Sequence, residues 1–142
     1  ASDVGVVRSL QVMDDDVDVA ITGDRVGVAL RNLREQSLHR GCMICVPGEE
    51  SLASHEKSCF ELEVAPFQSR VLSVGDVIHA ASDLQFSVGR VSALDSGSVT
   101  VDWESPLWIR TDGSSGVLIV QLDAIPMRIM GRARNIEIVN SH

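Results

Sequence analysis

Long apolar runs and a paired set of cysteines are both missing from this chain of 142 residues. Val117 to Val120 is one of the longer apolar runs, and it falls far short of the roughly 20 residues that a membrane-spanning helix needs. No basic segment followed by an apolar stretch opens the chain, so we expect no secretory signal. The three cysteines form an odd set without the spacing of a disulfide framework, which favours a reducing compartment. We therefore expect a cytoplasmic protein.

Lysine is nearly missing as well, since Lys57 stands alone beside eleven arginines in a total of 12 basic residues. The 20 acidic residues give the chain a net charge of -8. A nucleic acid is repelled by such a charge at long range, so any RNA contact must come from a local group of arginines. Arginine can grip a phosphate with two parallel hydrogen bonds, so its predominance permits specific anion recognition.

The sequence signatures of catalysis are also lacking. The chain has no G-x-x-x-x-G-K-[ST] loop for a nucleoside triphosphate and no G-x-S-x-G nucleophile elbow. The acidic run Asp14 to Asp16 lacks the central glycine and the distal glutamate of a calcium loop, so a solvated turn is favoured. We expect no enzymatic activity, cofactor or metal in this chain.

What the chain does have is a repeated alternation of apolar and polar residues. In Cys59 to Val64, Phe60, Leu62 and Val64 share one face and the glutamates take the other, the pattern of a half-buried antiparallel strand. Similar stretches are Val4–Val12, Arg25–Leu30, Cys42–Val46, Val77–Ala80, Phe86–Leu94, Val99–Trp103, Val117–Leu122 and Met127–Val139. Only Arg31 to Arg40 is predicted to be helical. With 44% apolar residues the chain can form a core, and we predict an all-β protein of small antiparallel β-barrels.

A polar stretch that opens with Pro47-Gly48 and ends at Lys57 predicts a boundary between two pieces, the second of which covers about residues 58–142. Six of the predicted strands follow the boundary and suffice for a closed barrel. Three precede it, too few to close a barrel without open edges. The first piece is therefore expected to be part of a barrel, which either packs on the second piece or continues upstream.

Cys42 and Cys45 form a C-x-x-C pair, followed by His55 and Cys59, and together these residues could be a zinc set. The predicted strand Cys42–Val46 argues against it, because residues three apart in a strand point to opposite faces. Small apolar cysteines in a barrel wall are the favoured interpretation, and zinc remains the alternative.

Arg128, Arg132 and Arg134 lie an even number of residues apart, so in an unbroken strand they share one face. Three guanidinium groups on one face would form a local anion site. A bulge at Gly131 would rotate this register. Alternatively, the arginines pair with nearby carboxylates such as Asp123 and Glu137.

Several short segments occur in an order that resembles the translational GTPases of the EF-Tu superfamily. Those similar to the second half of the domain II barrel are Arg8–Gln11, Gly23–Leu30 and Arg40–Gly48. Those most similar to the selenocysteine-specific branch, SelB, are Ile78–Ser82, Val88–Ser92 and Ser105–Trp108, together with Arg8–Gln11. The likeness covers nearly the whole chain.

The resemblance implies that residues 1–49 are the C-terminal part of domain II and that residues 50–142 are domain III. In that family the two barrels hold the acceptor arm of an aminoacyl-tRNA, which is delivered to the ribosome, while a separate G domain binds GTP and Mg²⁺ and hydrolyses GTP. Arg8 resembles a basic position facing the aminoacyl pocket, where a guanidinium would pair with an ionised selenol. The candidates for contact with the tRNA backbone are His79, Arg90, Arg128, Arg132 and Arg134.

Two alternatives remain at this stage. A related factor serving another special tRNA, such as one charged with pyrrolysine, would keep the barrels and change the pocket. A protein-interaction barrel would dock a G domain or the ribosome without touching tRNA. For His79 and Arg90 the structural alternative is packing and ion pairing in the barrel wall. DNA and membranes are not expected partners.

Overall fold

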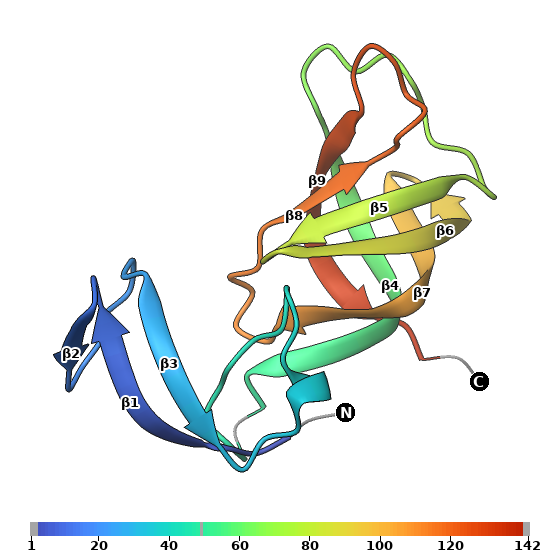
Figure 1. Ribbon diagram of the computed structural model, residues 1–142. Coiled ribbons are helices and arrows are strands. Elements are labelled where there is room, and N and C mark those ends of the chain that lie inside the picture. Colours follow the sequence, from blue (N-terminus) through green and yellow to red (C-terminus); the bar gives the residue numbers. More distant parts are fainter. Residues whose placement is uncertain (1–2, 49, 141–142) are drawn as a thin grey trace. The chain divides into compact units, whose positions relative to one another are not determined.

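The computed structural model describes residues 3–48 and 50–140, and its regular secondary structure is almost entirely β-strand (Figure 1). In chain order the elements are β1 (Val6–Val12), β2 (Asp15–Val17), β3 (Val26–Arg31), the 3-10 turn η1 (Glu35–Ser37), β4 (Leu52–Val64), β5 (Val77–Ser82), β6 (Gln85–Asp95), β7 (Ser98–Arg110), β8 (Val117–Val120) and β9 (Ile129–Ile138). They fall into two compact units, Ala1–Cys42 and Met43–His142. The predicted all-β class is confirmed, and in the described part of the chain no helix is long enough to cross a membrane.

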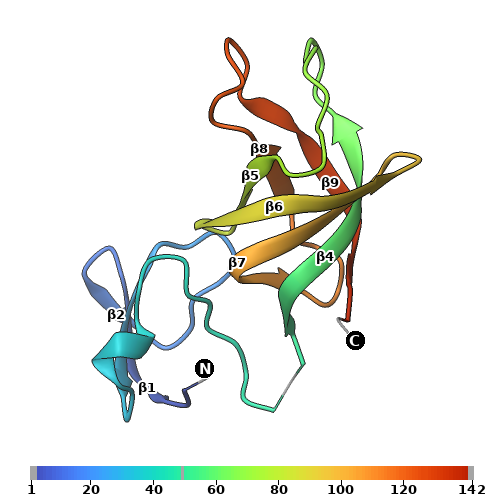
Figure 2. The same ribbon diagram turned by 90° about the vertical axis from the view of Figure 1, so that its right-hand side faces the viewer.

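The second unit is a closed antiparallel barrel of six strands (Figures 1 and 2). Around the barrel the strands follow the order β4-β7-β6-β5-β8-β9, and β9 pairs back to β4. Because the sheet closes on itself, every strand has a neighbour on both sides. The six-stranded barrel predicted for the second piece is confirmed.

The barrel interior is filled by alternate residues of the strands, as the period of two predicted. On β5, for example, Ile78 and Ala80 are fully buried while His79 between them is partly exposed. Gly89 faces the same interior, where a Cβ would lie 2.6 Å from the ring of Trp103, so only glycine leaves room for this indole. The buried apolar core consists of Phe60, Leu72, Ile78, Ala80, Val91, Val99, Val101, Trp103, Leu107, Ile109, Val117, Ile119, Ala124, Met130 and Ala133.

The first unit is a three-stranded antiparallel sheet in the order β2-β1-β3. Its cross-strand pairs put apolar side chains together on one face, where Leu10 of β1 lies opposite Val17 of β2 and Val28 of β3. Of residues 3–42, all of which the structure describes, none is buried. The apolar face of this sheet is therefore not covered by a core of its own.

Hydrogen bonds rather than a core hold the segment after β3. The Asp3 carboxylate accepts bonds from the backbone N–H of Arg34 at 3.0 Å and from the Ser37 hydroxyl at 2.9 Å. These bonds favour the ionised carboxylate and lower the pKa of Asp3. They anchor η1 to the beginning of the chain.

Four expectations about local structure are wrong. Cys42–Val46 is not a strand, and the helix expected over Arg31–Arg40 is reduced to the three residues of η1. Asp15 and Asp16, which were expected to lie in a turn, belong to the strand β2. The strand β4 begins at Leu52, inside the polar stretch interpreted as a boundary. These segments are short or polar, so tertiary pairing outweighs their local pattern.

Candidate nucleic-acid interface

Four adjacent strands of the barrel, β6-β5-β8-β9, present a continuous outer surface. In the register of the sheet, Phe86, Ala81, Leu118 and Arg132 form one row across these strands. A second row consists of Val88, His79, Val120 and Ile129, and a third begins with Arg90 and Val77. Directly opposed residues share one face of a sheet. We call this surface, made of the residues of the three rows, the basic wall.

The basic wall carries no carboxylate. Asp102, which lies directly opposite Arg90 on β7, forms its ion pair with Lys57 at 3.5 Å, and Asp83 pairs with Arg110 at 2.9 Å. Glu63, the direct cross-strand neighbour of Arg132, forms its ion pair with Arg134 at 3.2 Å. Among the described residues, Arg90 and Arg132 therefore form no ion pair, although each has a carboxylate opposite it on the neighbouring strand.

Three guanidinium groups of the wall and its edge keep free donors. Within residues 3–48 and 50–140, the side chain of Arg132 has neither a hydrogen bond nor an ion pair. Arg90 donates one bond, from Nη1 to the Gly75 carbonyl at 2.8 Å. Arg128, just before β9, donates one bond from Nε to the Leu122 carbonyl at 2.9 Å. Since a guanidinium has five N–H donors, all three can still hold an anion such as a phosphate.

His79 and Phe86 add an aromatic surface to the basic wall. Their rings are stacked, with centroids 4.5 Å apart and an angle of 17° between the planes. Phe86 is 55% exposed, and the Nδ1 atom of His79 is buried without a hydrogen-bond partner in the described residues. His79 thus packs in the barrel wall, as the structural alternative predicted. Its ring also forms part of the aromatic surface together with Phe86.

The expected common face of the three C-terminal arginines holds only for Arg132 and Arg134. Arg128 precedes β9, and the register against β8 shifts between Ile119 and Val120, so that Met130 and Gly131 are both buried. The rotation of register foreseen at Gly131 therefore occurs. Arg134 is neutralised by Glu63, whereas Asp123 pairs with Arg70 at 3.3 Å.

The pattern of the sequence did not indicate Phe86 and Leu118 as members of a site. Each is an ordinary apolar residue of a strand, and only the register of β5 with β6 and β8 brings both beside Ala81. Arg132 joins them through the pairing of β8 with β9. No sequence signal reports such cross-strand neighbours.

Arg8, the candidate for the aminoacyl pocket, belongs to the first unit. It is exposed on β1 at a bulge, because the register against β3 shifts between Val7 and Ser9. Its side chain has no ion pair or hydrogen bond to any described residue. A free guanidinium is available there for an anionic group.

The possible zinc residues have other surroundings. Cys42 and Cys45 are exposed outside any strand, so the argument that a strand separates them is wrong. His55 is 3% exposed and its Nδ1 lies 2.9 Å from the Ser58 hydroxyl inside the barrel wall. In the part of the chain that the structure describes, no three histidine, cysteine or acidic residues are grouped to hold a metal.

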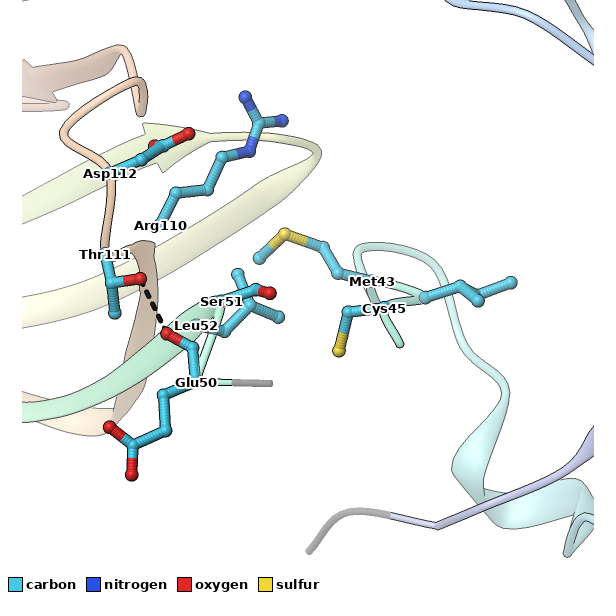
Figure 3. A pocket seen from close by; sticks show the side chains of 9 residues that line it. Met43, Cys45, Glu50, Ser51, Leu52, Arg110, Thr111 and Asp112 are labelled. Carbon is cyan, nitrogen blue, oxygen red and sulfur yellow. Dashed lines mark hydrogen bonds between the residues drawn. The ribbon is translucent and has the colours of Figure 1, made fainter. Parts of the chain in front are cut away.

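A second surface groove of about 530 Å³ lies beside β4 and the end of β7 (Figure 3). Several of its polar groups are already engaged. Thr111 donates a 2.6 Å bond to the Glu50 carbonyl, and Arg110 is paired with Asp83. Bonds from the Ser114 hydroxyl and N–H lower the pKa of Asp112. The groove therefore offers neither a free nucleophile–base pair nor an anion site comparable to the basic wall.

The chain is similar to selenocysteine-specific elongation factors in sequence and in fold, although no model of a known protein family matches it. Over 38 residues, 27% of this chain, it is 47% identical to such a factor from Methanocaldococcus jannaschii, of which the match covers 8%. The crystal structure of the bacterial selenocysteine-specific elongation factor EF-Sec matches 92% of this chain and 20% of that chain, with 20% identity and a TM-score of 0.72. The resemblance predicted from the short motifs is confirmed, and the chain spans only a small part of either relative.

Proposed function

We propose that this chain is part of a SelB-like elongation factor and that its second unit holds a special aminoacyl-tRNA through the basic wall. The observation that carries the proposal is the carboxylate-free outer surface with Arg90, Arg132 and, at its edge, Arg128, in a chain of net charge -8. The similarity to selenocysteine-specific elongation factors supports selenocysteinyl-tRNA, or a related special tRNA, as the ligand.

The chemistry of the wall suits the backbone of an RNA stem. An A-form stem exposes phosphates and 2′-hydroxyls while its base edges are hard to reach, so proteins recognise it largely by shape and charge. Guanidinium groups with spare donors match phosphate oxygens. Arg8 would serve the other end of the same ligand, by pairing with the ionised selenol of the aminoacyl group.

The chain itself would not catalyse a reaction. We propose that GTP and Mg²⁺ are bound by the factor's G domain outside these residues, and that residues 1–49 and 50–142 correspond to the end of domain II and to domain III. The ribosome and that G domain would be the protein partners. Such a factor would work in the cytoplasm.

The test is the affinity of the purified chain for aminoacyl-tRNA, with two double variants of equal charge change. Arg128→Glu with Arg132→Glu removes two uncompensated guanidinium groups. We expect at least about a tenfold loss of affinity in a low-salt binding assay, because charge-assisted hydrogen bonds contribute about 1.5–3 kcal/mol each. The matched control is Arg70→Glu with Arg134→Glu, whose guanidinium groups are already paired with Asp123 and Glu63.

The control variant should bind RNA far better than the wall variant. Equal losses in both variants would mean that only net charge matters and would contradict the wall as the site. No binding by the unmodified chain would favour the other candidate, a protein-interaction barrel. The exposed apolar side chains in the first row of the wall, Phe86 at 55% and Leu118 at 44%, are the observation in favour of that candidate.

A further inference from the structure

A groove of about 580 Å³ opens at one end of the basic wall. Phe86, Ala81, Leu118 and Arg132, one complete row of the wall, line it together with the β5–β6 turn. Its size lies within the about 300–1,000 Å³ typical of pockets for small ligands. The groove is open to solvent, so it adds a shallow hollow to the surface of the wall rather than an enclosed cavity.

The groove combines an aromatic ring with a guanidinium group that forms no ion pair among the described residues. Phe86 is half exposed and is held in place by the His79 ring stacked against it. The guanidinium of Arg132 is unengaged by any described residue. An aromatic face binds a planar base by stacking, and a free guanidinium binds a phosphate.

We propose that this groove receives a single unstacked nucleotide of the RNA that lies on the basic wall. Its base would stack on Phe86, and its phosphate would pair with Arg132. The inference rests on the proposed function, since it names the nucleotide that the same surface recognises. This nucleotide site would make binding specific for an unpaired position of the RNA, whereas the rest of the basic wall would contact only the RNA backbone.

The groove favours a planar anionic ligand over an apolar peptide. Asp83 in the turn is engaged by Arg110 at 2.9 Å, and Glu63, opposite Arg132 on β4, pairs with Arg134 at 3.2 Å, so Arg132 forms no ion pair with either of them. The stacked pair of aromatic rings offers a planar surface, which suits a base better than a branched aliphatic side chain.

The experiment compares two RNA hairpins that differ only by one bulged nucleotide in the stem. The unmodified chain is expected to bind the bulged hairpin about tenfold more tightly, since stacking of one base on an aromatic side chain is worth about 1–3 kcal/mol. Phe86→Leu keeps an apolar side chain but removes the ring. In this variant the preference should disappear while the affinity for the perfect hairpin stays. Phe67→Leu is the matched control, because Phe67 is fully exposed and lies outside the wall and the groove.

The results distinguish the two proposals. Equal, measurable binding of both hairpins by the unmodified chain would overturn the nucleotide site and leave the basic wall intact. Failure to bind either hairpin would overturn both. Loss of the preference in Phe67→Leu as well would also count against the groove. If an acidic peptide binds the unmodified chain but not Phe86→Leu, while the bulge has no effect, the groove is a peptide site and the inference is wrong.

Discussion

His55 and Ser58 of β4 and Trp103 of β7 are joined inside the barrel by two hydrogen bonds of 2.9 Å each. The indole N–H of Trp103 donates to the Ser58 hydroxyl oxygen, and Nδ1 of His55 shares the same hydroxyl. Ser58 is fully buried and His55 is 3% exposed. A neutral imidazole can accept the bond from Ser58, so the network is satisfied without a buried charge.

This network makes the stability of the chain sensitive to acid. Burial lowers the pKa of His55, so the unfolded chain binds a proton there at a higher pH than the folded chain. The stabilisation is therefore complete above the unfolded value of about 6.5 and is lost as the pH falls toward and below the folded pKa. We expect the free energy of unfolding in urea to decrease between about pH 7.5 and 5.5.

The variant His55→Gln, which stays neutral, should show a flatter dependence over the same interval. His39→Gln serves as its control, because it replaces an exposed histidine outside the barrel. A slope in His55→Gln as steep as that of the unmodified chain would show that other groups cause the acid sensitivity.

At the scale of elements, β9 decides how the barrel closes. Its residues pair with β8 on one side and with β4 on the other, and Gly131 lies opposite Ile119 of β8 and Val64 of β4. A Cβ on Gly131 would overlap the backbone carbonyl of Glu63 and lie 3.1 Å from the Leu62 side chain. Because the obstacle is backbone, the barrel cannot accommodate a side chain here by rotating a neighbour.

Gly131→Ala is expected to destabilise the barrel by about 1–3 kcal/mol, the range for overpacking in a well-packed interior. Gly116→Ala is the matched control, since a Cβ at Gly116 meets nothing within 4 Å. The free energies of unfolding in urea measure both effects. Similar values for the two variants would contradict the close approach of β9 to β4.

The turn between β5 and β6 is another element-scale feature that matters for the site. Asp83 and Leu84 have positive φ values of 45° and 65°, the backbone of a tight two-residue hairpin. Neither residue is glycine, so the turn had no sequence signal. It aligns β5 with β6 so that Phe86 lies opposite Ala81 beside the groove.

At the scale of the whole molecule, the distribution of charge matters more than its total. The net charge of -8 repels RNA at a distance, while Arg90, Arg128 and Arg132 attract phosphates at short range. Salt weakens both effects, but the release of counterions from RNA dominates the equilibrium when phosphates are contacted.

If the three arginines each contact one phosphate, the affinity for tRNA should fall with salt at a slope of about -2 to -3 in a double-logarithmic plot. Titrations over a series of potassium chloride concentrations measure this slope. Arg128→Glu with Arg132→Glu should reduce its magnitude by about 2. An unchanged slope in that variant would place the ionic contacts elsewhere on the chain.

Local pattern was sufficient to predict the second unit. Alternation in segments such as Cys59–Val64 and Val99–Trp103 identified the strands and their buried faces, because the side-chain period of a strand is a local property. It failed for Cys42–Val46, Arg31–Arg40 and Asp15–Val17, where short segments depend on the partners they find. The sequence also identified arginine as the only plentiful cation.

Which arginines remain available was decided by the tertiary structure alone. Arg132 and Arg134 are two residues apart on the same outer face of β9, yet Glu63 reaches Arg134 and leaves Arg132 uncompensated. Pairing of β5 with β6 and β8 then places Phe86 and Leu118 in the row that ends at Arg132. Residue types and strand faces follow from neighbours along the chain, whereas ion pairs and grooves follow from register between strands, which no single segment contains.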